Sequence, residues 1–370
     1  MIKWVGPVFD NSGYTQANRD YIKALYQQTK EITVQPFFPF LPHHETNELT
    51  KFITELSKNN LSSKFVIYHC VPEEIDKLVH KDKINIGYNT WETSFLPKHW
   101  VEKMNKYLDA VFVPSKFNET VYRISGVDIP IDVIPHCFDI NEFENIPNIP
   151  LQLKHKFKFL SVFQWTERKN PFGLLKAYFS EFREEDNVVL ILKTYGRDNS
   201  QHEQTKILEQ INTLKTDMNL EYYPPIYFIG KAMKRHEILA LYKESDCFIL
   251  TTRGEGFGMP YAEAALLENH VIASGFGGQV DFLKNDFSTL IDYQLAPVSG
   301  MSWIPNYNAH MYWAEPNIHH TKKAMRMIYE NPDILATSKK KAKEYISKTL
   351  NYDVVGKQLL DCILKYEKVN

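Results

Sequence analysis

The stretch Thr251–Ser274 reads T-T-R-G-E-G-F-G-M-P-Y-A-E-A-A-L-L-E-N-H-V-I-A-S, and the rest of the chain can be read outward from it. Before it, Cys247–Leu250 is a short apolar run without alternation, which favours a buried strand. Three glycines follow, and their freedom of φ lets a ligand approach the backbone closely. Pro260 suits the start of a helix, so the pattern predicts strand, glycine loop and helix. Unpaired amides and the dipole at such a helix start favour a phosphate.

Two carboxylates flank this predicted anion site. Glu255 lies in the loop, and we expect Glu263 in the first turn of the helix. A carboxylate accepts hydrogen bonds and donates none, which suits the hydroxyl pairs of a sugar or ribose. Carboxylates beside phosphate-directed amides therefore predict a nucleotide-sugar pocket. Short motifs have a high false-positive rate, so the alternative is a buried glycine turn in which Glu263 only favours the helix start.

The run E-G-F-G-M-P-Y-A-E, followed by an apolar helix and V-I-A-S, resembles the Glu-x7-Glu signature of retaining family-4 glycosyltransferases. The resemblance implies an α/β chain of the GT-B fold, with two Rossmann-like domains whose parallel sheets face each other across a cleft. It also implies donor-binding roles. Glu255 would hold the sugar hydroxyls, Glu263 the ribose, and the amides of Phe257, Gly258 and Met259 the sugar or phosphate.

The composition is that of a globular chain. Its 370 residues, 44% hydrophobic and 24% charged, allow two domains of ordinary size. The formal net charge of −2 gives no general attraction to nucleic acid. The four cysteines are far apart in apolar runs, which predicts buried thiols in a reducing compartment. We expect a cytoplasmic protein, because the start of the chain reads as a strand without a signal peptide and no run is long enough to span a bilayer.

Strand, glycine loop and helix recur at the amino end of the chain. Ile2–Val5 is a predicted strand, and the loop after it contains Gly13 and Tyr14, ahead of a helix. The loop lacks G-x-G-x-x-G and so gives no dinucleotide fingerprint. By the resemblance, Gly13 and Tyr14 belong to the glycine loop that faces the donor diphosphate and the acceptor.

Further strands alternate with helices, which predicts a parallel sheet covered by helices. Polar groups at the carboxyl ends of such strands are site candidates, and two of them are His69 after F-V-I-Y and Glu92 after I-G-Y-N-T-W. Many relatives have a histidine near the position of Glu92, where it contacts the transferred sugar. A carboxylate can hold a sugar hydroxyl equally well, so a catalytic and a structural role for Glu92 both stay open. For His69 the preferred interpretation is a buried structural role, with catalysis as the alternative.

A domain boundary is predicted near residue 150. The segment Glu144–Pro150 holds two prolines and two asparagines, which disfavours both helix and central strand. We therefore expect an acceptor-side domain over residues 1–150 and a nucleotide-sugar-binding domain over residues 151–349. In the GT-B fold the last helix, about residues 350–370, crosses back to the first domain.

A basic pair opens the second domain. After the predicted strand Phe157–Phe163, Arg168 and Lys169 stand just before the helix start N-P. Two cations there can bind a diphosphate and stabilise it as it leaves. The run E-R-K-N-P matches the basic region of the family, but many relatives have an arginine where this chain has Phe163 and Gln164. We expect the adjacent Arg168 to supply that charge.

Two weaker features lie further along. The run I-Y-F-I-G-K-A-M, Ile226–Met233, predicts a strand that ends in a glycine turn. In relatives the backbone of that turn contacts the nucleobase, which makes Gly230 and Lys231 donor-binding candidates. Lysines cluster on a predicted helix near residue 340. A solvated face is the default interpretation, and weak attraction to an anionic membrane is the minor one.

No D-x-D motif occurs, so a metal held by paired carboxylates on the diphosphate is not indicated, and we expect no cofactor.

The preferred function is transfer of a hexose from a GDP- or UDP-linked sugar to a hydroxyl of a glycan or similar acceptor. Retention of configuration is implied by the resemblance alone. Two alternatives stay open. One is a nucleotide-sugar-binding protein without transferase activity, and the other is a sugar phosphorylase of the GT-B type.

Overall fold

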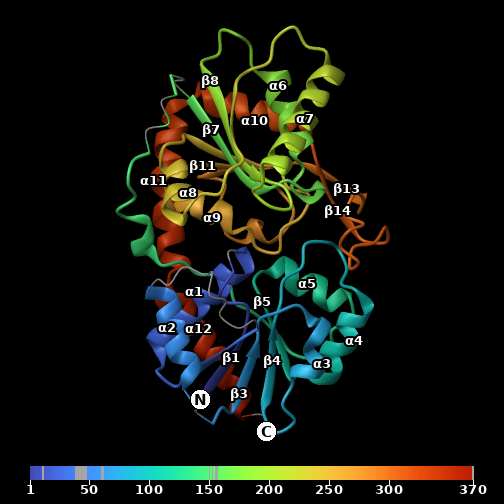
Figure 1. The fold of residues 1–370 in the computed structure, drawn as a ribbon, viewed down its shortest axis with the longest axis vertical. Coiled ribbons are helices and arrows are strands. Elements are labelled where there is room, and N and C mark those ends of the chain that lie inside the picture. Colours follow the sequence, from blue (N-terminus) through green and yellow to red (C-terminus); the bar gives the residue numbers. More distant parts are fainter. Residues whose placement is uncertain are drawn as a thin grey trace. The chain divides into compact units, whose positions relative to one another are not determined.

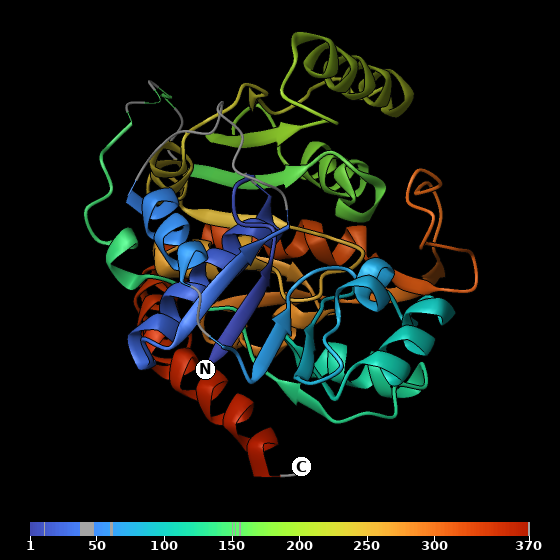
Figure 2. The same cartoon turned by 60° about the horizontal axis from the view of Figure 1, so that its bottom comes forward.

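The computed structural model describes residues 1–10, 12–37, 48–59, 62–149, 151, 153–154 and 157–368. The chain divides into two compact units, Met1–Ile140 with Lys348–Asn370, and Asn141–Ser347. The division after Ile140 falls earlier than residue 150, which itself lies outside the described residues. Figures 1 and 2 show that each unit consists of strands covered by helices.

The first unit is built on a six-stranded parallel sheet. Its strands are β1 Ile2–Gly6, β2 Ile32–Pro36, β3 Phe65–Tyr68, β4 Ile84–Tyr88, β5 Ala110–Val113 and β6 Ile131–Val133. Its helices are α1 Gly13–Gln28, α2 Glu48–Lys58, α3 Ile75–Leu78, α4 Lys98–Tyr107, α5 Lys116–Ile124 and α12 Tyr352–Lys365. The strand order is β2-β1-β3-β4-β5-β6, so the direction of winding reverses between β1 and β3. Ligands of such sheets bind at this reversal, outside the carboxyl ends of the strands.

The second unit repeats the plan with another strand order. Its six-stranded parallel sheet contains β7 Phe157–Gln164, β8 Val188–Tyr195, β9 Ile226–Ile229, β10 Cys247–Leu250, β11 His270–Ser274 and β12 Ser288–Ile291. The helices are α6 Pro171–Glu181, α7 Gln201–Met218, α8 Arg235–Lys243, α9 Met259–Leu266, α10 Ile318–Glu330 and α11 Pro332–Thr349. The order β12-β11-β10-β7-β8-β9 puts the reversal between β7 and β10. An antiparallel hairpin, β13 Tyr293–Pro297 and β14 Tyr312–Pro316, follows the sheet.

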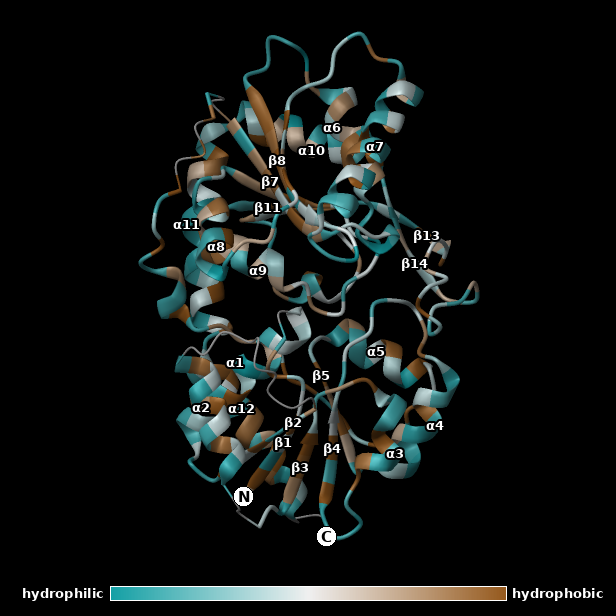
Figure 3. Ribbon diagram, viewed as in Figure 1, coloured by the Kyte–Doolittle hydropathy of each residue, from teal (hydrophilic) through white to brown (hydrophobic). Residues whose placement is uncertain are grey.

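The strands form the cores of both units, as the brown runs along them in Figure 3 indicate. All four residues of β10 are fully buried, as expected for a strand covered on both faces. Several helices begin at a Ser or Asn whose side chain accepts a hydrogen bond from an amide of the first turn, which stabilises the helix start. These capping residues include Ser12, Ser115, Asn170, Ser200, Asn317 and Asn351. The expected α/β class with parallel sheets is confirmed.

The last helix belongs to the first unit. In Figures 1 and 2 the red helix α12 lies beside the blue helix α1. The two helices approach closely at Gly356, where an added Cβ would lie 2.6 Å from the carbonyl oxygen of Ala24. The Tyr352 hydroxyl donates a hydrogen bond to Asp20 of α1 over 2.6 Å. This contact accounts for the inclusion of residues beyond Lys348 in the first unit.

The cysteines are free, but their burial differs from the expectation in one case. Cys70, Cys137 and Cys247 are buried, whereas Cys362 on α12 is half-buried.

Among the helices that the structure describes, none is both long and apolar enough to cross a lipid bilayer. Three lysines of α11, Lys339, Lys341 and Lys343, have acidic neighbours in their own unit. Lys339 lies 3.5 Å from Asp246 and Lys343 3.3 Å from Glu268, which supports the interpretation as a solvated face.

Candidate active site

Two glycines with positive φ shape the loop after β10, one within that loop and one in the loop after β11. Gly258 has φ +91° and stands at the N-cap of α9, where an added Cβ would lie 2.6 Å from the ring of Tyr261. Gly277 has φ +113°, and its Cβ would lie 2.7 Å from the carbonyl oxygen of Glu255. The amide of Gly278 donates to that same oxygen over 2.8 Å. The backbone of Glu255 is therefore fixed from the neighbouring loop.

The side chain of Glu255 lies between two cations. Lys169 Nζ contacts Oε1, and Arg168 Nη1 lies 3.3 Å from Oε2. Only 7% of Glu255 is exposed. Burial by itself would raise the pKa of Glu255, but the charges of Lys169 and Arg168 outweigh it and lower that pKa. The structure thus brings the predicted basic pair and the predicted loop carboxylate into one cluster, which we call the ionic triad.

The basic pair is positioned by its own short helix and by the glycine loop. Arg168 and Lys169 lie on the 3-10 helix η3 Glu167–Lys169, between β7 and α6. Asn170 takes the left-handed conformation and caps α6, as predicted. The amide of Arg253 donates to the Arg168 carbonyl over 2.7 Å, and the Arg168 side chain donates to the Gly254 carbonyl over 2.7 Å. The two loops at the reversal between β7 and β10 are therefore joined to each other.

Glu263 lies in the second turn of α9, not in the first as expected, because the helix already begins at Met259. Its buried carboxylate receives a hydrogen bond from Arg235 Nη1 over 2.6 Å. The same guanidinium binds both carboxylate oxygens of Glu142, over 3.1 and 3.2 Å. Burial would lower the pKa of Arg235, but Glu263 and Glu142 raise it above its ordinary value.

Arg235 is a residue of the site that the sequence analysis missed. It is the first residue of α8, where a cation is unfavourable to the helix dipole. A cation at such a position needs a nearby anion, and this is the signal that could have pointed to it.

The other donor-binding candidates of the second unit lie at different depths. Phe257 is buried and packs on Phe282, with ring centroids 4.8 Å apart. Met259 opens α9 and is half-buried, and Gly258 before it has no side chain to cap the helix amides. Gly230 and Lys231 follow β9 at the edge of the sheet, with β8 between them and β7. The structure brings the first three to the reversal and leaves the last two at the edge.

Two candidates of the first unit lie elsewhere than expected. Gly13 and Tyr14 are the first two residues of α1, not part of a glycine loop, because Ser12 caps the helix just before them. The half-buried ring of Tyr14 packs on His69, with centroids 4.6 Å apart. His69 is 1% exposed, and burial, with a smaller contribution from His136, holds its pKa well below the ordinary value. His69 is therefore a neutral ring in an aromatic core.

Glu92 is half-buried beyond the carboxyl end of β4. Trp91, the residue before Glu92, is bound by the buried side chain of Asn118. This side chain accepts a hydrogen bond from the Trp91 amide over 3.1 Å and donates one to the Trp91 carbonyl over 2.6 Å. Thr93 on the other side is fully buried and accepts a hydrogen bond from the indole of Trp91. The backbone that carries Glu92 is thus rigidly held.

Comparison with known proteins assigns the region that contains the ionic triad. Residues 142–294 match the family described as Glycosyl transferases group 1. The matched domain lies within the second unit, Asn141–Ser347. The domain contains the ionic triad, Glu263 and both partners of its salt-bridge network, Arg235 and Glu142.

The chain is also similar to individual known proteins over most of its length. It is 24% identical over 309 residues to the UDP-forming alpha,alpha-trehalose-phosphate synthase of Yarrowia lipolytica, covering 73% of this chain and 63% of that protein. The chain therefore spans less than two thirds of this relative. Among solved structures, the sucrose-phosphate synthase of Thermosynechococcus elongatus has a TM-score of 0.70 at 15% identity, over 100% of this chain and 99% of that one.

A second solved structure is HepE from Anabaena in complex with UDP-glucose. Its TM-score is 0.68 at 14% identity, over 98% of this chain and 99% of that one. At such low identities the structures establish the fold, and the expected GT-B fold is confirmed. The match of residues 142–294 to this family supports glycosyltransferase activity.

Proposed function

We propose that the protein is a retaining, family-4 hexosyltransferase that moves a sugar from a nucleotide-diphosphate donor to a hydroxyl of a glycan acceptor. One observation carries the proposal: the ionic triad joins the loop after β7 to the loop between β10 and α9, at the strand reversal where ligands of such sheets bind. The neighbour HepE was solved with UDP-glucose, which favours a UDP-linked over a GDP-linked hexose.

The ionic triad suggests how the donor would be received. Two cations face one carboxylate, so the cluster keeps a net positive charge for an incoming diphosphate. On donor binding, Arg168 and Lys169 would turn from Glu255 to the phosphates. The carboxylate of Glu255 would then be released to accept hydrogen bonds from sugar hydroxyls. The amides of Gly258 and Met259, with the dipole of α9, would add to phosphate binding.

Glu263 would hold the ribose. Arg235 donates to its Oε1, which fixes the carboxylate in one orientation, and carboxylate oxygens can accept further hydrogen bonds from ribose hydroxyls. Arg235 would then be a positioning residue, since it acts on the ribose only through Glu263.

The chemistry proposed is a substitution at the anomeric carbon of the sugar. The bond from this carbon to the diphosphate oxygen breaks, and a bond to the acceptor oxygen forms on the same face. The proton of the acceptor hydroxyl passes to an oxygen of the departing phosphate. Arg168 and Lys169 would stabilise the charge on the leaving diphosphate, the role that a metal ion has in other transferases, so we propose that no metal is needed.

The test is donor turnover. The full chain is incubated with UDP-glucose, UDP-galactose, UDP-N-acetylglucosamine and GDP-mannose, and free nucleotide is measured with and without EDTA. Specific binding should also raise the melting temperature, because a ligand of the native state stabilises it. Release of nucleotide from one donor, insensitive to EDTA, is expected. Absence of both binding and release for every donor would refute the proposal.

A further inference from the structure

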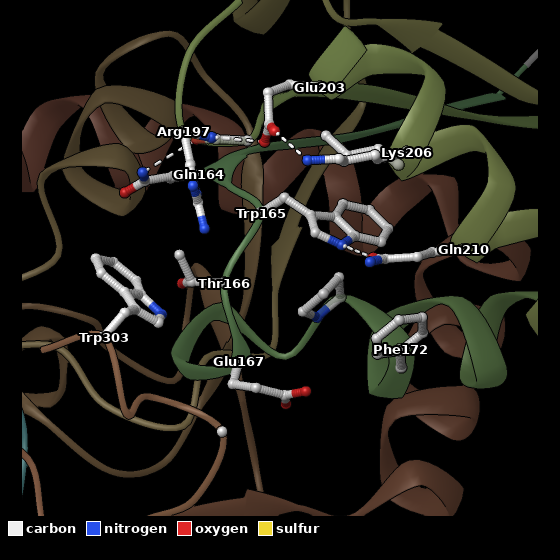
Figure 4. Close-up of a pocket in the computed structure, with 14 residues that line it drawn as sticks. Gln164, Trp165, Thr166, Glu167, Phe172, Arg197, Glu203, Lys206, Gln210 and Trp303 are labelled. Atoms are coloured by element: carbon white, nitrogen blue, oxygen red, sulfur yellow. Dashed lines mark hydrogen bonds and ion pairs between the residues drawn. The ribbon is translucent and has the colours of Figure 1, made fainter.

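A hollow of about 540 Å³ opens in the second unit beside η3 (Figure 4). Its walls come from the end of β7, the start of α6, the loop from β8 into α7, and the segment around Trp303. Within the part of the chain that the structure describes, its lining does not include the members of the ionic triad. The hollow lies between β7 and β8 and so to one side of the reversal at β7 and β10.

Trp165 forms a fixed floor for this hollow. Its ring stacks on Phe163 with a centroid distance of 6.1 Å and an interplanar angle of 21°, and it meets the edge of Phe172 at 5.8 Å. The indole nitrogen donates to Gln210 of α7 over 2.6 Å, and the backbone amide donates to the Tyr195 carbonyl over 2.8 Å. The ring is held on several sides and offers a rigid flat surface.

Trp303 forms the opposite wall and is 59% exposed. In Figure 4 the two indoles stand on either side of the hollow, and the side chain of Arg197 reaches into the space between them. The segment with Trp303 lies against η3, because a Cβ on Gly300, at φ +70°, would meet Glu167 at 2.4 Å. An exposed indole that faces a second indole across a hollow can give a bound ligand apolar contact area on two sides.

The polar groups around the two rings are held by one another. Glu203 accepts from the Arg197 amide over 3.0 Å and pairs with Lys206 over 3.0 Å. The amide of Gln164 donates to the Gly196 carbonyl over 3.1 Å. Carboxylate, amide and cationic groups thus surround an aromatic floor, providing both donors and acceptors to a ligand with many hydroxyls.

We propose that this hollow binds a pyranose unit of the acceptor glycan, an inference that rests on the proposed function. The C–H face of a pyranose carries slight positive charge and packs on the negative face of an indole. Each of its hydroxyls can both donate and accept a hydrogen bond, and the polar side chains around the hollow can do the same. Glu167 lines the hollow and Arg168 follows it directly, so a sugar bound here lies next to the donor phosphates.

The test measures saccharide binding apart from nucleotide binding. Wild-type protein is titrated with maltose, cellobiose, lactose, mannobiose and chitobiose by saturation-transfer NMR, with and without UDP. We expect one of them to bind wild type, about tenfold weaker binding to Trp303→Ala, and a smaller loss in Trp165→Phe, where a flat ring remains. Tyr312→Ala, a 40% exposed aromatic on β14 outside the hollow, should bind like wild type.

The UDP-induced rise in melting temperature separates the outcomes. It should be the same in wild type and in both tryptophan variants. If the tryptophan variants lose UDP binding, the hollow holds the nucleobase and the inference is wrong. It is equally overturned if no disaccharide binds wild type, or if binding is unchanged in both variants. Failure of wild type to bind UDP or release nucleotide refutes the proposed function instead, because saccharide binding is measured without nucleotide as well.

Discussion

At the strand reversal of the first unit, between β1 and β3, the chain gathers rings; at the reversal of the second, between β7 and β10, it gathers charges. In the first unit His69 is neutral and packs against Tyr14, Tyr21 and Tyr88. In the second, Glu255 stays ionised between two cations. Two sheets of one architecture therefore support different chemistry, since the site depends on the loops and not on the fold.

The largest expected effect is in the ionic triad. Lys169→Ala should lower the rate of transfer about a hundredfold or more, because a cation that stabilises the leaving diphosphate is lost. Turnover of donor to free nucleotide measures it. Lys176→Ala is the matched control, since Lys176 is an exposed lysine on the neighbouring helix α6. Wild-type turnover in Lys169→Ala would show that this cation of the ionic triad has no part in the transfer.

Glu255→Gln tests the carboxylate with little change of shape. We expect the rate of transfer to fall strongly. A neutral amide does not balance the charges of Arg168 and Lys169, and it accepts hydrogen bonds from sugar hydroxyls more weakly than a carboxylate does. Glu209→Gln, an exposed residue on α7, controls for the substitution itself. A variant that turns over normally would leave Glu255 as a structural counter-ion only.

Arg235→Ala should weaken the second unit and its nucleotide binding together. It leaves Glu263 and Glu142 without their shared cation, which we expect to cost about 1–3 kcal/mol of unfolding free energy, since the guanidinium is partly exposed. Denaturant unfolding and the UDP-induced shift in melting temperature measure the two effects. Arg235→Lys should restore part of the stability, because it keeps the charge but not the forked geometry.

The two helix-start glycines offer a direct contrast between the units. Gly258→Ala combines positive φ with a clash against Tyr261 and should cost about 1–3 kcal/mol. Gly13→Ala meets nothing within 4 Å and should be neutral or stabilising by about 0.5–1 kcal/mol. Chemical denaturation of both variants checks this. Equal losses would show that the glycine loop of the second unit has no special role.

The smallest expected effect is a pH dependence of the first unit. Burial lowers the pKa of His69 and lowers that of His136 to about 3, so the folded state favours both neutral rings. Stability from these rings is complete above the ordinary value of 6.5 and is lost as the pH falls below it. His69→Gln should flatten part of the decline in unfolding free energy between pH 7 and 5. An unchanged slope would contradict the neutral core.

Much of the charged site could be predicted from the sequence, because its signals are local. The strand before the glycines, the cap at Asn170 and the adjacent cations are all short patterns. The turn that holds Glu263 was misplaced, since Gly258 caps α9 and starts it one residue earlier than Pro260 suggested. Ser12 similarly caps α1, and a serine before G-Y-T was the signal that Gly13 and Tyr14 are helical.

Contacts between distant segments could not be predicted. Arg235 meets Glu142 across many residues of sequence, and Trp165 shares a hollow with Trp303 only because the chain folds back there. No periodicity encodes such pairs: a local pattern can suggest that Arg235 needs an anion, but it does not name the distant partner.

The close packing of α12 on α1 at Gly356 has a consequence for biosynthesis. The second unit is one continuous segment, Asn141–Ser347, and all of it leaves the ribosome before α12 does. The unit whose strands are made first is therefore the one completed last. Until α12 emerges, the face of α1 around Ala24 stays uncovered, and a truncation that removes α12 would destabilise the unit that is synthesised first.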